Sequence, residues 1–151
     1  MGTRLPEAGA WEFLHDKYHS DTQAIQQIMR YITTQTKTCC FTGHRPGKLP
    51  SNNSDGMSVL RKRLIKAIHS AGAKGYSVFL NGGAHGTDII AGEIVSAMRD
   101  KSDFHYITLI TLVPHKLQAK KWSDEWRSRY ARLLDASDLV FNTNVDYTPS
   151  C

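Results

Sequence analysis

Residues 78–88 read Val-Phe-Leu-Asn-Gly-Gly-Ala-His-Gly-Thr-Asp, an apolar run that breaks into a glycine-rich turn before a helical pattern begins. This order predicts a β-strand, a loop and the first turn of an α-helix. The glycines let the backbone turn sharply and approach a ligand closely, and the positive end of the helix dipole favours an anion there. No Gly-Lys-Ser/Thr sequence follows, so the stretch is not a P-loop, and a plain tight turn capped by Thr87 or Asp88 is the alternative interpretation.

A second loop that can carry chemistry follows an earlier apolar strand. Residues 38–42 predict that strand, and residues 43–47, Gly-His-Arg-Pro-Gly, follow it directly. His44 can donate, accept or shuttle a proton, and Arg45 can bind a phosphate or carboxylate through two N–H groups. A solvated turn is the alternative interpretation of this loop.

Apolar strands alternate with amphipathic helical patterns along the chain. The strands are expected near residues 39, 76, 107 and 138. This alternation predicts an α/β fold, a Rossmann-like open parallel sheet of at least four strands with helices on both faces. Ligands of such sheets bind outside the carboxyl ends of the strands. If the first two strands are neighbours, the loops at 43–47 and 81–88 meet in one crevice, with residues 114–118 and 142–144 as possible walls.

Residues 1–37 are expected to form an N-terminal helical extension. Their apolar residues fall at helical spacing over 11–18 and 25–32, and Ser20 or Asp21 is a natural N-cap for the second segment. We therefore predict two short helices that pack on the sheet or mediate dimerisation.

The composition limits the class of protein. At 151 residues, 40% of them hydrophobic, the chain suits one globular domain. No apolar run reaches the roughly 18 residues of a membrane-spanning helix, and the first residues lack the apolar core of a signal peptide, so we expect a cytoplasmic protein with no membrane partner. Cys39, Cys40 and Cys151 lack metal-site spacing, and no metal is expected. The formal net charge of +5 suits an anionic ligand.

The two loops also carry a family resemblance. Its residues are Cys-Cys-Phe-Thr-Gly-His-Arg-Pro at 39–46, Asn-Gly-Gly-Ala-His-Gly-Thr-Asp at 81–88, Ala91, Glu93, Pro114, Trp122, Tyr130 and Ala-Ser-Asp at 136–138. Together they resemble the SLOG superfamily of Rossmann-like domains, and specifically its YpsA-like branch, over about residues 38–148. The superfamily includes the LOG phosphoribohydrolases, the DprA proteins that process DNA, and sensors of nucleotide-derived signals in antiviral defence. The resemblance implies a domain over residues 38–151 with a nucleotide-like ligand, but not a single activity.

Two departures from the family pattern limit what the resemblance implies. The LOG enzymes carry a catalytic glutamate three positions beyond the threonine of the glycine turn, where this chain has Ile90. This argues against phosphoribohydrolysis of the cytokinin type. The YpsA-like branch usually continues past the segment that matches Tyr147 into a further helix and strand, whereas this chain ends at Cys151. We therefore expect either a C-terminally truncated sheet or an exposed edge that a partner or the N-terminal helices cover.

The predicted ligand-binding residues come from the two loops and from the end of a third strand. They are Thr42, Gly43, His44, Arg45, Asn81, Gly82, Gly83, Ala84, His85, Gly86, Thr87, Asp88 and Pro114. We expect the backbone N–H groups of residues 82–87 to hold phosphate, Arg45 to add positive charge, Asp88 to accept a ribose hydroxyl, and His44 to contact base or phosphate.

Three functions remain open from these residues. The leading hypothesis is a domain that senses or sequesters a nucleotide or a nucleotide-derived signal, with no firm cofactor beyond that ligand, in a homodimer or higher homo-oligomer. The second is a hydrolase of an N-glycosidic or phosphate bond, with His44 or Glu93 as acid or base.

The third hypothesis is binding of single-stranded nucleic acid. It uses the basic residues of 61–66 together with Arg127, Arg129 and Arg132, which are expected to face solvent or a partner.

Overall fold

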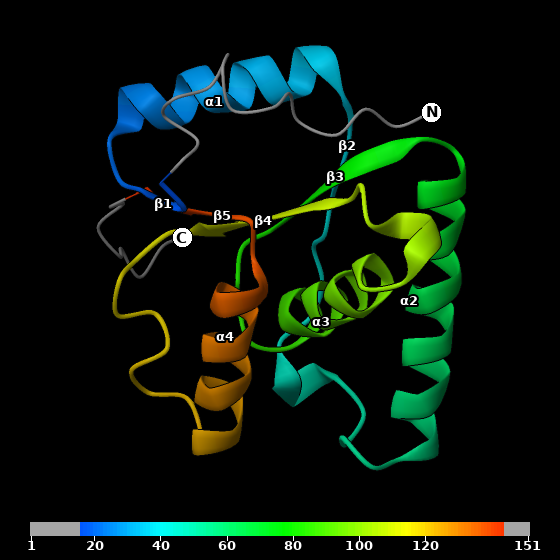
Figure 1. Ribbon diagram of the computed structural model, residues 1–151. Coiled ribbons are helices and arrows are strands. Elements are labelled where there is room, and N and C mark those ends of the chain that lie inside the picture. The colour runs from blue at the N-terminus through cyan, green and yellow to red at the C-terminus, as the bar shows by residue number, and fades with distance from the viewer. Residues whose placement is uncertain (1–15, 144–151) are drawn as a thin grey trace.

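Five parallel strands form one sheet, and helices cover both of its faces (Figure 1). The computed structural model describes residues 16–143. In chain order its elements are β1 Tyr18–His19, α1 Thr22–Gln35, β2 Lys37–Cys40, the 3-10 helix η3 Pro46–Lys48, α2 Asp55–Ala73, β3 Tyr76–Asn81, α3 Thr87–Arg99, the 3-10 helix η4 Ser102–Phe104, β4 Thr108–Val113, α4 Asp124–Ala136 and β5 Leu139–Asn142. The predicted Rossmann-like α/β fold is confirmed.

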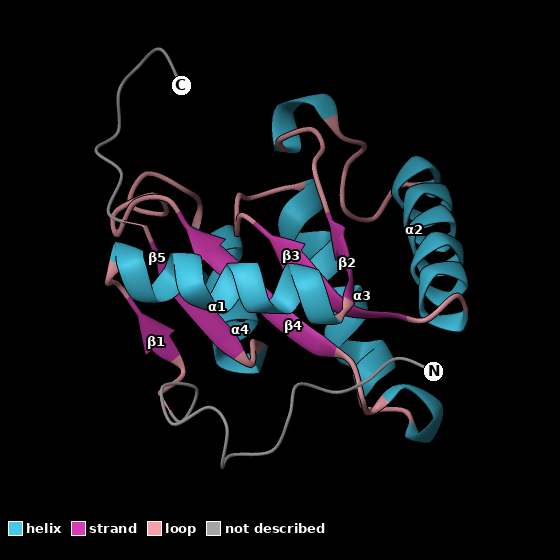
Figure 2. Ribbon diagram, turned by 90° about the horizontal axis from the view of Figure 1, so that it is seen from above, coloured by secondary structure: helices cyan, strands magenta, loops and turns pink. Residues whose placement is uncertain are grey.

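The strand order is β1-β5-β4-β3-β2, and every neighbouring pair is parallel. α1 leads from β1 at one edge of the sheet to β2 at the other, and the next three strands return in sequence toward β1. Figure 1 shows α1 on one face and α2, α3 and α4 on the opposite face, and Figure 2 shows the same layers from above. Because all strands are parallel, their carboxyl ends lie along the same border of the sheet, which is called its carboxyl edge below.

The alternating side chains of β3 explain how one strand serves both layers. Val78 and Leu80 are buried in the cluster that includes the α1 isoleucines, whereas Phe79 is buried in the cluster formed with α2, α3 and α4. Successive side chains of a strand point to opposite faces, and a strand covered on both faces is apolar throughout. The uninterrupted apolar run before the glycine turn therefore marks a central strand of the sheet.

Tyr18 lies in a strand and not in the first predicted helix. It pairs with Val140 of β5, and the Lys17 carbonyl accepts a hydrogen bond from Val140 N at 2.8 Å. The pairing exists because β5 offers an open edge, which helical spacing in the sequence does not reveal. Asp21 caps α1 as predicted, since its carboxylate accepts from Gln23 N at 3.0 Å. Residues 16 and 17 are bends and not helical, and residues 11–15 of the first predicted helix lie outside the described residues.

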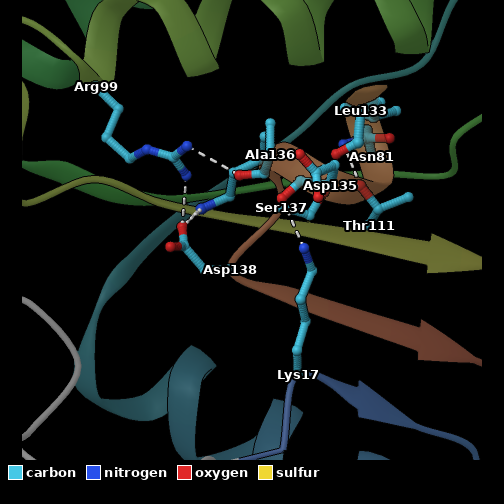
Figure 3. A network of polar contacts seen from close by, with 10 residues as sticks. Lys17, Asn81, Arg99, Thr111, Leu133, Asp135, Ala136, Ser137 and Asp138 are labelled. Atoms are coloured by element: carbon cyan, nitrogen blue, oxygen red, sulfur yellow. Dashed lines mark hydrogen bonds and ion pairs between the residues drawn. The ribbon is translucent and has the colours of Figure 1, made fainter. Parts of the chain in front are cut away.

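Arg99 ties α3 to the start of β5 at the amino end of the sheet (Figure 3). Its Nη1 donates to Asp138 Oδ2 and its Nη2 to Ala136 O, each at 2.9 Å. The Asp138 carboxylate also accepts from Leu109 N at 2.8 Å. These contacts hold the amino ends of β4 and β5 to the helices, at the opposite end of the sheet from the two predicted loops.

Gly92 lets α3 and α4 pack closely. A Cβ at this position would lie 2.4 Å from Leu133 Cδ1. Beside this contact a buried polar chain runs from Asn81 Nδ2 to Thr111 Oγ1 at 3.2 Å and from Thr111 Oγ1 to Ser137 Oγ at 2.8 Å (Figure 3). Ser137 Oγ in turn donates to Leu133 O at 2.7 Å. These hydrogen bonds link β3, β4 and the end of α4, so that the end of β3 is fixed where the glycine turn begins.

Among the described helices, none is both long enough and apolar enough to span a bilayer.

Candidate functional site

The two loops singled out in the sequence lie against each other at the carboxyl edge of the sheet. They follow β2 and β3, which are paired neighbours. Thr87 donates to the carbonyl oxygen of His44 through its N–H at 3.1 Å and through its hydroxyl at 3.0 Å. A Cβ on Gly43 would lie 2.5 Å from Thr87 Cγ2, so that only glycine fits at this crossing. The strand order thus brings the two loops into contact, as expected, and the region that residues 42–45 and 81–88 border is called the crevice below.

Gly86 allows the loop at 43–47 to cross the start of α3. Its φ of +104° and ψ of −132° lie in a region that side chains almost never adopt. A Cβ on Gly86 would also lie 2.6 Å from the carbonyl oxygen of His44. Glycine is therefore required here twice, once for its backbone angles and once for the close approach of Arg45 and His44.

The N–H groups of residues 82–84, in the first part of the glycine turn, are hydrogen-bonded within the protein. Asp88 Oδ2 accepts from Gly82 N at 3.1 Å, and the same carboxylate accepts from Ala84 N. Gly83 N donates to Asn81 Oδ1 at 2.8 Å. In this conformation Asp88 and Asn81 occupy the positions that an anion bound to the N–H groups of residues 82–84 would need, which is the first part of the predicted phosphate cradle at 82–87.

Three ionisable groups influence one another in the crevice. Burial raises the pKa of the half-buried Asp88 carboxyl above its usual 3.8, while the hydrogen bonds from the turn and the charge of Arg45 act in the opposite direction. Burial, and then the charge of Arg45, lower the pKa of His85 below its usual 6.5. Across the described residues Arg45 is exposed and has no ion-pair partner. Its guanidinium is thus available to an anion, beside a neutral imidazole and a carboxylate.

Aromatic side chains from the segment after β4 and from α4 pack against the glycine turn. The ring of His85 stacks on Trp122, with centroids 4.4 Å apart and planes 16° apart. Trp122 meets Tyr130 edge to face at 5.4 Å, and Gln118 Nε2 donates to Tyr130 Oη at 3.1 Å. A Cβ on Gly83 would lie 3.3 Å from Gln118 Nε2. The predicted wall at 114–118 therefore does border the glycine turn.

The remaining predicted site residues fall into two groups. Thr42, His44 and Pro114 are exposed at the ends of their strands. Asn81 is only 2% exposed, and its amide is committed to Gly83 N and to Thr111 Oγ1, which makes it a support of the turn. Of the other predicted wall, Asn144 lies outside the described residues.

Glu93, one of the two predicted acid or base residues, is bound to Arg129. Arg129 Nε donates to Glu93 Oε2 at 2.9 Å and Nη2 donates to Oε1 at 2.5 Å. Arg129 is 8% exposed, and its guanidinium lies over the Trp126 ring at 4.2 Å. The prediction that Arg129 faces solvent or a partner is wrong, because spacing alone placed it with the exposed arginines of α4. Glu93 neutralises this buried cation between α3 and α4.

Sequence reasoning missed two contacts of the site, the stacking of His85 on Trp122 and the hydrogen bond from Gln118 to Tyr130. The segment between β4 and α4 has no periodic pattern, so no sequence signal relates its side chains to the glycine turn. Within residues 16–143, no three His, Cys, Asp or Glu side chains are grouped so that they could hold a metal ion.

A parallel sheet covered on both faces, with two glycine-bearing loops meeting at its carboxyl edge, defines a Rossmann-like domain. Residues 39–150 match the YpsA family model, which is described as the YspA SLOG family, and the chain belongs to this family. Membership relates it to nucleotide-related Rossmann-like domains.

The chain is also similar to a UPF0398 protein of Halalkalibacterium halodurans, with 28% identity over 106 residues. The matched part is 69% of this chain and 55% of that protein, so the chain spans about half the length of this curated relative.

Proposed function

We propose that this domain binds a nucleotide or a nucleotide-derived signal in the crevice between residues 42–45 and 81–88. The observation that carries the proposal is the convergence, at the carboxyl edge of the sheet, of a half-buried Asp88 carboxylate and an exposed Arg45 that has no ion-pair partner within residues 16–143. An arginine fork suits the phosphate of such a ligand, and a carboxylate accepts hydrogen bonds from its hydroxyls. We expect the exposed His44 ring to contact base or phosphate.

A binding role fits the site better than hydrolysis. Glu93 is held by Arg129 between two helices and serves the fold, and of the two predicted acid or base residues only His44 lies in the crevice. Sensing or sequestering a ligand needs no general acid or base. We therefore place the chain among ligand-binding SLOG domains.

Binding of single-stranded nucleic acid has less support. Of the arginines expected to form that surface, Arg129 is buried and Arg127 is paired with Asp124 on its own helix. The exposed Lys62, Arg63 and Lys66 lie along α2, and Arg132 is the one exposed arginine of that set on α4 with no ion pair within residues 16–143.

The experiment that tests the proposal is a thermal-shift screen of mono-, di- and cyclic nucleotides and ADP-ribose derivatives, with native mass spectrometry of the bound species. A ligand at about 100 times its Kd stabilises a protein by about 2.7 kcal/mol, which corresponds to about 5–10 °C for a chain of this size. Arg45→Ala is expected to abolish the shift. Arg63→Ala removes an equal charge from exposed α2 and is expected to keep it.

Recovery of an intact nucleotide would support binding, whereas a cleaved product would favour the hydrolase. Equal loss of the shift in both arginine variants, or no shift with any nucleotide, would contradict the proposal.

We also propose that the protein is a homodimer, because β2 is the outermost strand on its side of the described sheet and an open edge invites pairing. Light scattering at working concentration tests this. A monomeric mass would refute it.

A further inference from the structure

The glycine turn and Asp88 determine which chemical group of the ligand lies against the turn. This inference rests on the nucleotide-binding function proposed above. Asp88 accepts hydrogen bonds from Gly82 N and Ala84 N, and Asn81 accepts one from Gly83 N. A phosphate on these N–H groups would have to displace the carboxylate or lie beside it. Like charges at such a distance repel, so that the turn as it stands disfavours phosphate.

The carboxylate of Asp88 retains capacity for further hydrogen bonds. An ionised carboxylate offers about four acceptor positions, and no donor positions. Two of the positions are used by Gly82 and Ala84, and the half-buried side chain keeps part of its surface exposed. A ligand group that meets Asp88 must therefore be a hydrogen-bond donor, a hydroxyl or an amine.

The position of Arg45 decides between these two donors. A Cβ on Gly86 would lie 3.0 Å from Arg45 Cα, so the Arg45 backbone crosses the chain two residues before Asp88, and the charge of Arg45 acts to lower the pKa of the Asp88 carboxyl against the larger effect of burial. The two groups of the ligand that Arg45 and Asp88 recognise must therefore be close together. In a nucleotide the phosphate and the ribose hydroxyls are close neighbours, whereas the amino groups of the base lie at the far end of the molecule.

We propose that Asp88 excludes phosphate from the glycine turn and binds a ribose hydroxyl there, while Arg45 holds the phosphate at the mouth of the crevice. The ligand class is a ribonucleotide with a free hydroxyl on the sugar. Asp88 is the specificity residue of the site, since it replaces an anion-binding turn by a surface that accepts hydrogen bonds.

The first test compares ribonucleotides with their 2′-deoxy and 3′-deoxy forms on the unmodified protein, by isothermal titration calorimetry. A hydrogen bond to a charged group corresponds to about a ten- to hundred-fold change in affinity. One of the deoxy forms is expected to bind weaker by this factor. Equal affinities for all three forms would overturn the inference while leaving nucleotide binding intact.

The second test needs no nucleotide and uses inorganic phosphate as its probe. Asp88→Ala frees the N–H groups of Gly82 and Ala84, and the variant is expected to bind phosphate at least about tenfold more tightly than the unmodified protein. Asp100→Ala removes an exposed carboxylate just beyond the other end of α3 and is expected to gain nothing.

Asp88→Asn keeps the shape of the side chain and serves if the alanine variant does not fold. It is expected to lose the preference for the ribose hydroxyl, because an amide is a weaker acceptor than a carboxylate. If the unmodified protein binds phosphate as tightly as Asp88→Ala does, the carboxylate does not exclude phosphate from the glycine turn. Failure of every nucleotide to bind would instead count against the proposed function, since the phosphate test stands without it.

Discussion

Replacing Glu93 by Gln removes the anion that neutralises Arg129 and leaves the shape of the side chain nearly unchanged. Glu93 accepts two hydrogen bonds from Arg129, whose side chain is 10% exposed, while its own side chain is 27% exposed. Hydrogen bonds to charged groups contribute about 1.5–3 kcal/mol each, and the glutamine oxygen still accepts one of the two. Partial exposure of Glu93 reduces the loss by solvent screening.

We therefore expect Glu93→Gln to lower the free energy of unfolding by about 2 kcal/mol, or the Tm by about 4–8 °C. Urea unfolding followed by circular dichroism measures the change. Glu125→Gln is the matched control, because that side chain is 59% exposed and 3.8 Å from Arg129, and its effect should stay within about 0.5 kcal/mol.

A double-mutant cycle with Arg129→Met isolates the pair. The double variant leaves no unpaired buried charge, so the cost of the two changes together should be smaller than the sum of the single costs by about 2 kcal/mol. Additive costs would contradict the pairing. Unchanged stability of Glu93→Gln together with loss of nucleotide turnover would show instead that Glu93 is a catalytic group.

Three further predictions follow from the site and its supports. Gly86→Ala forces a side chain into a glycine-only conformation, with its Cβ 2.6 Å from the His44 carbonyl oxygen. It should lower the free energy of unfolding, measured in urea, by about 1–3 kcal/mol and abolish nucleotide binding. Gly47→Ala, with open space around it, should change neither. His85 has a pKa below 6.5 in the native state, so its contribution to stability is complete above pH 6.5 and is lost as the pH falls below that value. Urea midpoints measured between about pH 5 and 7.5 should therefore fall less toward acid pH in His85→Phe than in the unmodified protein. Gly92→Val should overpack the contact with Leu133 and lower stability by about 1–3 kcal/mol in the same assay, and an unchanged midpoint would refute the close approach of the two helices.

The main elements of the fold were predictable because their patterns are local. The apolar run of β3, the glycine turn and the amphipathic pattern after it predicted a central strand and the start of α3, and the structure has β3 ending at Asn81 and α3 beginning at Thr87. By contrast, β1 is only two residues long and exists through its pairing with β5. A strand so short leaves no pattern in the sequence.

The site was predictable in its place but not in its hydrogen bonding. Parallel neighbours bring the loops after β2 and β3 together, and this followed from the alternation of strands and helices. That Asp88 turns back into the glycine turn, or that Arg129 is buried on Glu93, depends on side-chain directions between elements far apart in sequence. Spacing along one helix cannot supply these directions.

Hydrogen-deuterium exchange with a stabilising nucleotide reports where on the chain the ligand acts, and so separates binding at the two loops from binding on α2. We predict slower exchange in residues 42–45 and 82–88 and no change in residues 61–66 of α2, and we expect Arg45→Ala to remove the effect. Protection confined to residues 61–66, or protection of the loops that persists in Arg45→Ala, would contradict the proposed site.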